Sequence, residues 1–113
     1  MKLTAEWFWV DRWMGSSAFL LPMEARGLYR EMLSQAWRRG AQLPNDPAAI
    51  QRAVAAQPWE WERTWPLVRG YWQERNGILV NETQVEIFRD SQDKLIRASE
   101  HGRKGALGRF GRR

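Results

Sequence analysis

Tryptophan is the residue that most restricts how this chain can fold. Eight of the 113 residues are tryptophan, and four of them fall between Ala56 and Trp72. Burying one large aromatic side chain removes about 150–250 Å² from water, a gain of roughly 4–6 kcal/mol. An exposed ring on which a nucleic-acid base stacks returns only about 1–3 kcal/mol, and only when nucleic acid is present. Tryptophans that share one helix face are therefore expected to form the core.

Three of the four tryptophans of this stretch share a face of a predicted helix. Four large side chains recur at helical spacing: Trp61, Trp65, Val68 and Trp72. We expect the helix to begin at Pro58 and to bury this stripe together with Trp37 of an earlier helix. Pro66 interrupts the hydrogen-bond pattern, so either the helix kinks there or a second short helix begins.

Trp59 falls on the opposite side of the same helix, beside Arg63 one turn later. One interpretation is an aromatic ring and a guanidinium presented to nucleic acid or to a protein partner. The other is a self-contained cation–π pair, or a tryptophan that folds back on the helix start. Leu67 also faces outward, and we treat Trp59 and Leu67 as candidate partner-binding residues.

Two further helices precede this one. The first is predicted to begin at Pro22 and to end at Gly40, with one apolar stripe at helical spacing. The stripe comprises Ala25, Leu28, Tyr29, Met32, Leu33, Ala36 and Trp37. A turn follows, and Asp46 and Pro47 then predict the cap and first residue of a short second helix.

The remaining segments predict two kinds of β-structure and a last helix. Asn76-Gly77 lies between two β-compatible runs and predicts a hairpin with a type I′ turn. The segment Glu6–Val10, with its aromatic and β-branched residues, predicts a short strand. From Asn81 onward an amphipathic helix is expected to run into a Gly/Arg-rich end; its apolar residues are Val85, Phe88, Leu95 and Ile96.

This order of elements predicts an α+β fold that is mostly helical and resembles a winged helix. Three helices followed by a two-stranded hairpin wing form that arrangement, in which the third helix usually enters the major groove of DNA. We expect residues 1–90 to form the winged-helix-like domain. Residues 91–113 are expected to comprise the end of the C-terminal helix and a basic tail.

Charge is distributed very unevenly along the chain. The net charge is +5, all thirteen acids lie at or before Glu100, and the residues up to that point sum to zero. A neutral globule with a cationic tail suggests a polyanion as partner, although such a tail can also serve solubility alone. The candidate nucleic-acid-binding residues are Arg103, Lys104, Arg109, Arg112 and Arg113 in the tail, with Arg52, Arg63 and Arg75 in the folded part.

Other classes of protein have little support in the sequence. The chain has no cysteine and one histidine, His101, so we expect no metal and no cofactor. It shows no phosphate loop or catalytic carboxylate pair, because Glu60 and Glu62 point to different sides of a helix. We therefore expect no enzyme and no small-molecule substrate. The absence of a long apolar run and of a leader-like start predicts a cytoplasmic protein without a membrane partner.

Four stretches together resemble one protein family, the YdaU-like prophage domain. They are "WFWVDRW", "LLPMEARGLYREMLSQAWRRGAQLPND", "WEWERTWPLVRGYW" and "NGILVNETQVEIF". The resemblance covers about Glu6 to Phe88 and is most specific in the "LxxExxGxYR" pattern that starts at Leu21. It implies a winged-helix-like domain related to phage replisome organisers, which bind DNA and self-associate.

Two functions remain open at this level. The first is a phage- or prophage-derived nucleic-acid-binding protein that acts in DNA replication initiation or regulation, with DNA favoured over RNA. The alternative is a protein–protein interaction module that self-associates or docks on a larger nucleoprotein assembly, and that contacts nucleic acid only through its tail. The neutral body and the acids of the third helix favour the alternative, since a strong reader of DNA sequence presents more cations.

Overall fold

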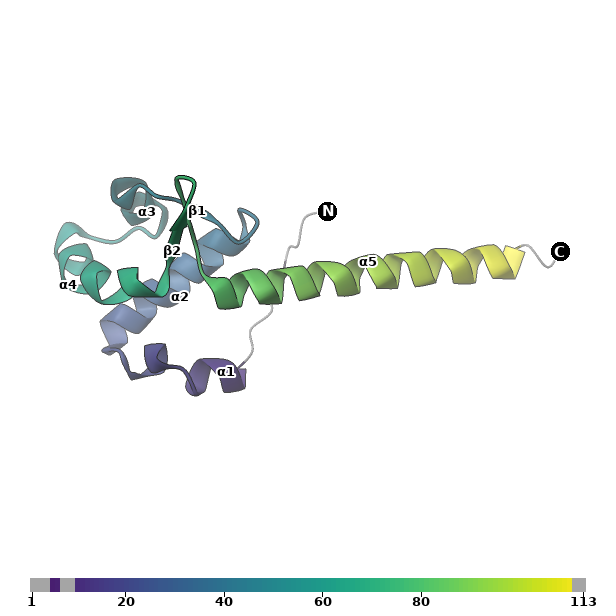
Figure 1. The fold of residues 1–113 in the computed structure, drawn as a ribbon, viewed down its shortest axis with the longest axis horizontal. Helices are drawn as coiled ribbons and strands as arrows, with labels where there is room; N and C mark the ends of the chain where they lie inside the picture. Colours follow the sequence, from purple (N-terminus) through teal and green to yellow (C-terminus); the bar gives the residue numbers. More distant parts are fainter. Residues whose placement is uncertain (1–4, 7–9, 111–113) are drawn as a thin grey trace.

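The computed structural model describes the backbone of residues 5–6 and 10–110, and the side chains of that range through Gly102. The fold is α+β and mostly helical, with one small antiparallel sheet (Figure 1). The elements are α1 (Val10–Met14), η1 (Ser17–Leu20), α2 (Met23–Trp37), β1 (Leu43–Pro44), α3 (Pro47–Ala53), α4 (Pro58–Val68), η2 (Arg69–Tyr71), β2 (Gln73–Arg75), β3 (Ile78–Val80) and α5 (Glu82–Phe110).

Helix α2 is the centre of the core, as its apolar stripe predicts. All seven residues of the stripe are buried. Pro22 is the N-cap residue and Met23 the first helical one, so the helix begins one position later than predicted. Gly40 follows the helix with a φ of 78°, a left-handed conformation that favours glycine.

The short helices α3 and α4 begin where the sequence predicts. The side chain of Asp46 accepts a hydrogen bond from the backbone N–H of Ala49 at 3.3 Å, and Pro47 opens α3. Pro58 opens α4, where the Glu60 carboxylate accepts a bond from the Gln57 N–H at 3.0 Å. The helix continues through Pro66 to Val68 and then tightens into the 3₁₀ turn η2.

The tryptophan stripe is buried with one partial exception. Trp61, Val68 and Trp72 are 9%, 0% and 2% exposed. Trp65 is half-buried and stacks on Trp61, with ring centroids 4.6 Å apart. Trp72 lies beyond the helix in extended backbone, so the helical wheel predicted its burial but not its conformation. Trp37 is 4% exposed and packs its ring edge-to-face with a ring of α5.

The predicted hairpin is present, and a third strand extends it. Asn76 and Gly77 have φ values of 52° and 82°, as a type I′ turn requires. Strands β2 and β3 pair antiparallel, and β1 adds to the free edge of β3 to give the order β1-β3-β2. The sequence analysis did not predict β1, which is only two residues long and pairs Leu43 with Leu79.

The predicted N-terminal strand is wrong where the structure can be compared with it. Glu6 lies outside any strand and Val10 begins helix α1, while residues 7–9 lie outside the described residues. β-propensity is a weak preference that the rest of the fold can override. Arg12 of α1 pairs with Glu86 of α5 at 3.3 Å, an exposed ion pair that joins the two helices.

Helix α5 is much longer than a closing helix of the globule needs to be. It runs for 29 residues and crosses the predicted boundary at residue 90 without interruption. Its backbone stays helical through the Gly/Arg-rich segment as far as Phe110, where the sequence predicts a tail. No helix of the described residues is long and apolar enough to span a membrane.

Candidate nucleic-acid interface

The feature that dominates the surface is the free end of α5, which projects from the globule (Figure 1). Its last buried side chain is Ser91, at 2% exposed. Every described side chain from Asp93 to Gly102 is exposed. The radius of gyration is 18.1 Å, against about 13 Å for a compact chain of this length. A helix of this kind can reach a partner that the globule does not touch.

The projecting part of α5 carries most of the cations that the sequence singled out. Arg103, Lys104 and Arg109 lie on its helical backbone, with their side chains outside the described ones. Arg112 and Arg113 lie outside the described residues altogether. The sequence analysis predicted these five as a tail, whereas three of them are on a helix.

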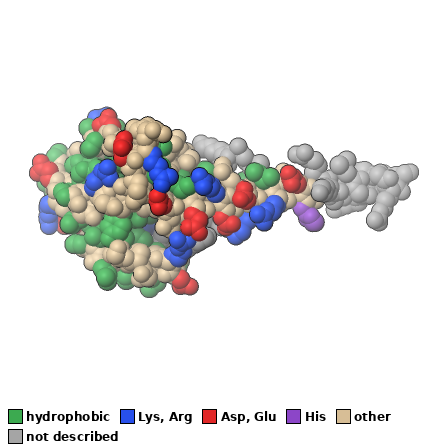
Figure 2. All heavy atoms as spheres, in the orientation of Figure 1, with side chains coloured by type: hydrophobic (Ala, Val, Ile, Leu, Met, Phe, Trp, Pro, Cys, Tyr) green, Lys and Arg blue, Asp and Glu red, His purple; other side chains and the backbone are tan. Residues whose placement is uncertain are grey.

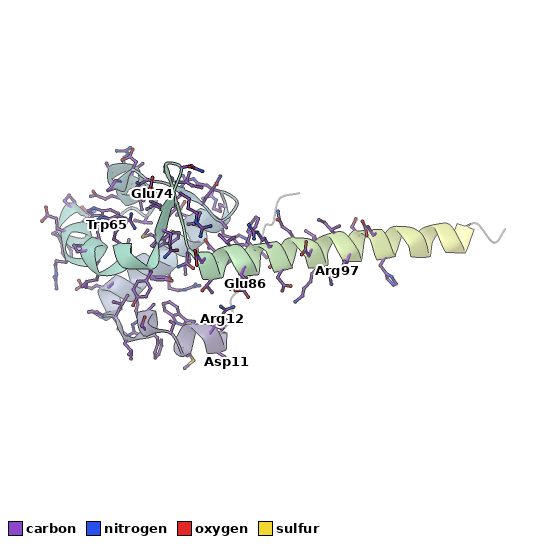
Figure 3. The ribbon with its side chains drawn as sticks, viewed as in Figure 1. Asp11, Arg12, Trp65, Glu74, Glu86 and Arg97 are labelled. Carbon is purple, nitrogen blue, oxygen red and sulfur yellow. The ribbon has the colours of Figure 1, made fainter. Side chains whose placement is uncertain are left out.

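Two further cations, which the sequence analysis missed, lie on the same projection. Lys94 is exposed and pairs with Asp90 at 3.1 Å, one turn earlier on α5. Arg97 is exposed and extends from the projecting helix well away from the globule (Figure 3). From Lys94 to Phe110 the helix holds five cations and one acid, a net charge of +4. A signal for both residues was present in the sequence, because cations outnumber acids from Lys94 onward.

Arg63 is engaged within the fold. Its guanidinium pairs with the carboxylate of Glu24 on α2 at 3.6 Å and lies 6.0 Å from the centroid of the Trp59 ring. The structure therefore shows the cation–π pair that was one of the interpretations of Trp59 and Arg63. Because both members of the ion pair are more than half exposed, with side-chain exposures of 63% and 53%, Arg63 is weakly held.

The other two predicted arginines of the globule lie on different elements. Arg75 of β2 pairs with Glu82 at the start of α5, and both side chains are exposed. Arg52 of α3 is exposed, and no ion pair is found for it among the described residues. The three arginines thus come from α3, α4 and β2, and two of them have acids beside them. They form a weaker cationic surface than the end of α5.

The candidate partner-binding residues both face solvent. Trp59 is 57% exposed and Leu67 is 46% exposed, and both belong to α4. Large apolar side chains at this exposure offer an anchor for another protein. Hydrophobic side chains also gather elsewhere on the visible face of the globule (Figure 2).

The described side chains offer little for metal or acid–base chemistry. No group of three or more His, Cys, Asp or Glu residues within the described part of the chain could hold a metal ion. Glu60 is tied to the start of α4 as its cap, while Glu62 is exposed two residues later. Burial raises the pKa of the Tyr29 hydroxyl above its ordinary value. This residue belongs to the core.

Asn81 is a structural centre that the sequence analysis did not identify. Its amide nitrogen donates to the Tyr29 hydroxyl at 2.7 Å and to the Tyr71 carbonyl at 3.0 Å. Its side-chain oxygen accepts from the backbone N–H of Gln84 at 3.0 Å, which caps α5. One buried side chain therefore joins the start of α5 to α2 and to η2.

Comparisons with known proteins add no relative to this description. A scan against protein-family models, a search of curated proteins and a search of solved structures each found no match to the chain.

Proposed function

We propose that this chain is a nucleic-acid-binding protein of the winged-helix type, in which the cationic end of α5 makes the phosphate contacts. We further propose that it is phage- or prophage-derived and acts in DNA replication initiation or regulation. This narrower role rests on the resemblance of the sequence to YdaU-like prophage domains. DNA is favoured over RNA for the same reason.

The winged-helix assignment is supported by the order of elements. Helix α2, strand β1, helices α3 and α4, and the hairpin β2–β3 follow one another, with β1 beside β3 in the sheet. In this interpretation α4 occupies the position of a recognition helix and Asn76-Gly77 forms the tip of the wing. Because the fold alone does not establish binding, the charges carry the proposal.

The observation that carries the proposal is the charge on a helix that nothing in the described structure covers. Phosphate contacts supply affinity through the release of counterions, and they require cations on an accessible surface. The segment from Lys94 to Phe110 provides five cations on one extended helix. Helix α4 has no such excess, because its acids Glu60 and Glu62 outnumber Arg63. We therefore expect binding to the phosphate backbone with little sequence specificity.

A comparison of two charge-matched variants tests this assignment. In the first, Arg103, Lys104 and Arg109 are replaced by Gln, which removes three cations and favours helix. In the second, Arg52, Arg63 and Arg75 are replaced by Gln, which removes the same charge from the globule. Fluorescence anisotropy with labelled duplex DNA, single-stranded DNA and RNA measures the affinity of each.

The proposal expects the α5 variant to lose at least about tenfold in affinity, uniformly across sequences. It expects the globule variant to lose less than about threefold. Equal losses would mean that the globule shares the interface with α5 and would contradict the dominant role given to α5. A loss confined to the globule variant would refute the role of α5.

A protein–protein module is the second candidate, and the exposed pair Trp59 and Leu67 is the observation that favours it. Tryptophan is enriched at interface hot spots, and Leu67 adds a second exposed apolar side chain on the same helix. If α4 docks on a protein, Trp59→Ala should weaken that complex and leave DNA affinity unchanged. Capture of the same partner by the Trp59→Ala protein at equal affinity would remove Trp59 as the anchor.

A further inference from the structure

The single histidine of the chain lies in a row with three cations on the projecting part of α5. Lys94, Arg97, His101 and Lys104 follow one another at spacings of three, four and three residues on a continuous helical backbone. An α-helix turns about 100° per residue, so positions three and four apart share a face. The four Cα atoms therefore lie in one strip of the helix surface, about 15 Å long. We call these four residues the row.

The described part of the row is open to a large partner. Arg97 and His101 are exposed, and Figure 3 shows Arg97 on the helix beyond the globule. Lys94 is held by Asp90 at 3.1 Å, but both side chains of this pair are exposed and such a pair is weak. Nothing in the described structure covers the row at Arg97 or at His101.

The acids of α5 limit where a polyanion can lie. Asp90 precedes Lys94 by one turn on the same face, and Glu86 precedes Asp90 by one more. Both acids repel phosphates at the globule end of the row. Glu100, four residues before Lys104, lies at the edge of the row and is the one acid beyond Lys94. A polyanion on this face is therefore expected to lie from Lys94 outward.

We propose that phosphates of one DNA strand lie along the row and that His101 makes one of the contacts, so that binding strengthens as the pH falls. This inference rests on the proposed function of α5 and adds the face of the helix and its regulation. One strand of B-DNA carries a phosphate per roughly 3.4 Å of helix axis, so a strip of about 15 Å can meet several successive phosphates.

The direction of the pH dependence follows from the charge of the ligand. Histidine is the side chain whose charge ordinarily changes between about pH 5 and 8, whereas lysine and arginine keep their charge throughout that range. A phosphate favours the charged imidazolium, so the bound state takes up a proton. By linkage, the affinity rises as the pH falls through this range and decreases as the pH rises. The row then offers four charges at low pH and three at high pH.

Three variants separate the charge of the imidazole from its position on the helix. His101→Gln makes position 101 neutral, and His101→Arg gives it a permanent charge; glutamine and arginine both favour helix. The third variant combines His101→Gln with Ser99→His. Ser99 is exposed, and positions two apart point to opposite sides of a helix, so this variant moves the imidazole out of the row.

Fluorescence anisotropy measures the affinity of the wild-type chain and of each variant for labelled duplex DNA and for labelled single-stranded DNA. The titrations are made at about pH 5.5 and about pH 8, each at several salt concentrations. An α-amino group also changes charge in this range. Because it is common to all four proteins, the differences between them report on the histidine.

We expect the wild-type chain to bind about two- to fivefold more tightly than His101→Gln at the lower pH and equally at the higher pH. Its salt dependence should also be steeper at the lower pH, by about 0.9 in the logarithmic slope. His101→Arg should bind at both pH values as tightly as the wild type does at the lower one. The variant with the relocated histidine should behave like His101→Gln.

Two results would overturn the inference while DNA binding by α5 stands. The wild type and His101→Gln could respond equally to pH, which would remove His101 as a contact. The relocated histidine could restore the full response, which would mean that the row is not the face that meets the phosphates. A chain that binds neither DNA at either pH would overturn this inference and the proposed function together.

Discussion

Replacing Asn81 by Ala should destabilise the fold more than any single surface change, because three of its contacts are lost at once. The side chain is only 6% exposed. It caps α5 through Gln84 and donates to both Tyr29 and Tyr71, which belong to α2 and η2. The variant therefore loosens the junction of three elements.

The size of the effect follows from those contacts. Loss of an N-cap costs about 1 kcal/mol. The Tyr29 hydroxyl, in a side chain 7% exposed, and the Tyr71 carbonyl each lose a donor, at about 1–3 kcal/mol apiece. The sum is about 3–7 kcal/mol, a large part of the roughly 5–15 kcal/mol by which domains are stable. At about 4 °C per kcal/mol for a chain of this length, the corresponding fall in Tm is roughly 13–30 °C.

Urea unfolding followed by tryptophan fluorescence measures this loss, with Asn81→Ser as the matched variant. Serine keeps an oxygen that can cap α5 but has no amide to donate, so it should recover only the cap, about 1 kcal/mol. The m-value should stay unchanged in both variants. A loss below about 1 kcal/mol for Asn81→Ala, or full stability in Asn81→Ser, would refute the role given to the two donated bonds.

The remaining predictions concern pH, backbone conformation and the outer face of α4. Burial is the largest cause that raises the Tyr29 pKa above 10.0, and the hydrogen bond from Asn81 opposes it. Since the folded state holds this proton more tightly, the stability contributed by Tyr29 should be constant below pH 10 and fall as the pH rises above it. Urea titrations at several pH values should show a smaller fall in Tyr29→Phe than in the wild type. Gly77 has a φ of 82°, so Gly77→Ala should cost about 1–2 kcal/mol. Gly27→Ala should raise the free energy of unfolding by at most about 1 kcal/mol, because a Cβ there meets nothing within 4 Å. If urea melts gave Gly77→Ala and Gly27→Ala the same change in stability, this contrast would be contradicted. Trp59→Ala should change stability by less than about 0.5 kcal/mol, and a larger loss would mean that the ring is part of the core.

The sequence predicted the elements whose patterns are local. The stripe of α2, the Asp46–Pro47 start of α3, the Pro58 start of α4 and the Asn76-Gly77 turn all depend on residues a few positions apart. Each of them was predicted to within about one residue, because helix spacing, capping and positive φ act over one or two turns.

The elements that depend on distant contacts were not predicted. Strand β1 is two residues long, and its pairing with β3 spans more than thirty residues of sequence. Val10 begins helix α1, which an exposed ion pair joins to α5, so its own β-propensity did not decide its conformation. Trp72 is buried, but it lies in extended backbone after η2, with its ring beside that of Tyr29, and not on the helix on which the wheel placed it.

The sequence predicted which residues give the candidate site its charge, but not the helix on which they lie. Charge counting located the cations at the end of the chain, yet the glycines among them suggested a tail and gave no sign of a helix to Phe110. The ion pairs of Arg63 with Glu24 and of Arg75 with Glu82 join different elements, so only the fold reveals them. The amide of Asn81 reaches Tyr29 from 52 positions away, a contact that no local pattern encodes.

The salt dependence of DNA binding, with and without residues 101–113, tests the central claim most directly. If the five cations of that segment each neutralise one phosphate, the logarithm of the affinity should fall with the logarithm of salt concentration at a slope near −4.5. This corresponds to about a 500-fold loss between roughly 50 and 200 mM salt. The account predicts that the chain ending at Glu100 loses most of this slope together with most of its affinity. An unchanged affinity and an unchanged slope in the shortened chain would contradict it.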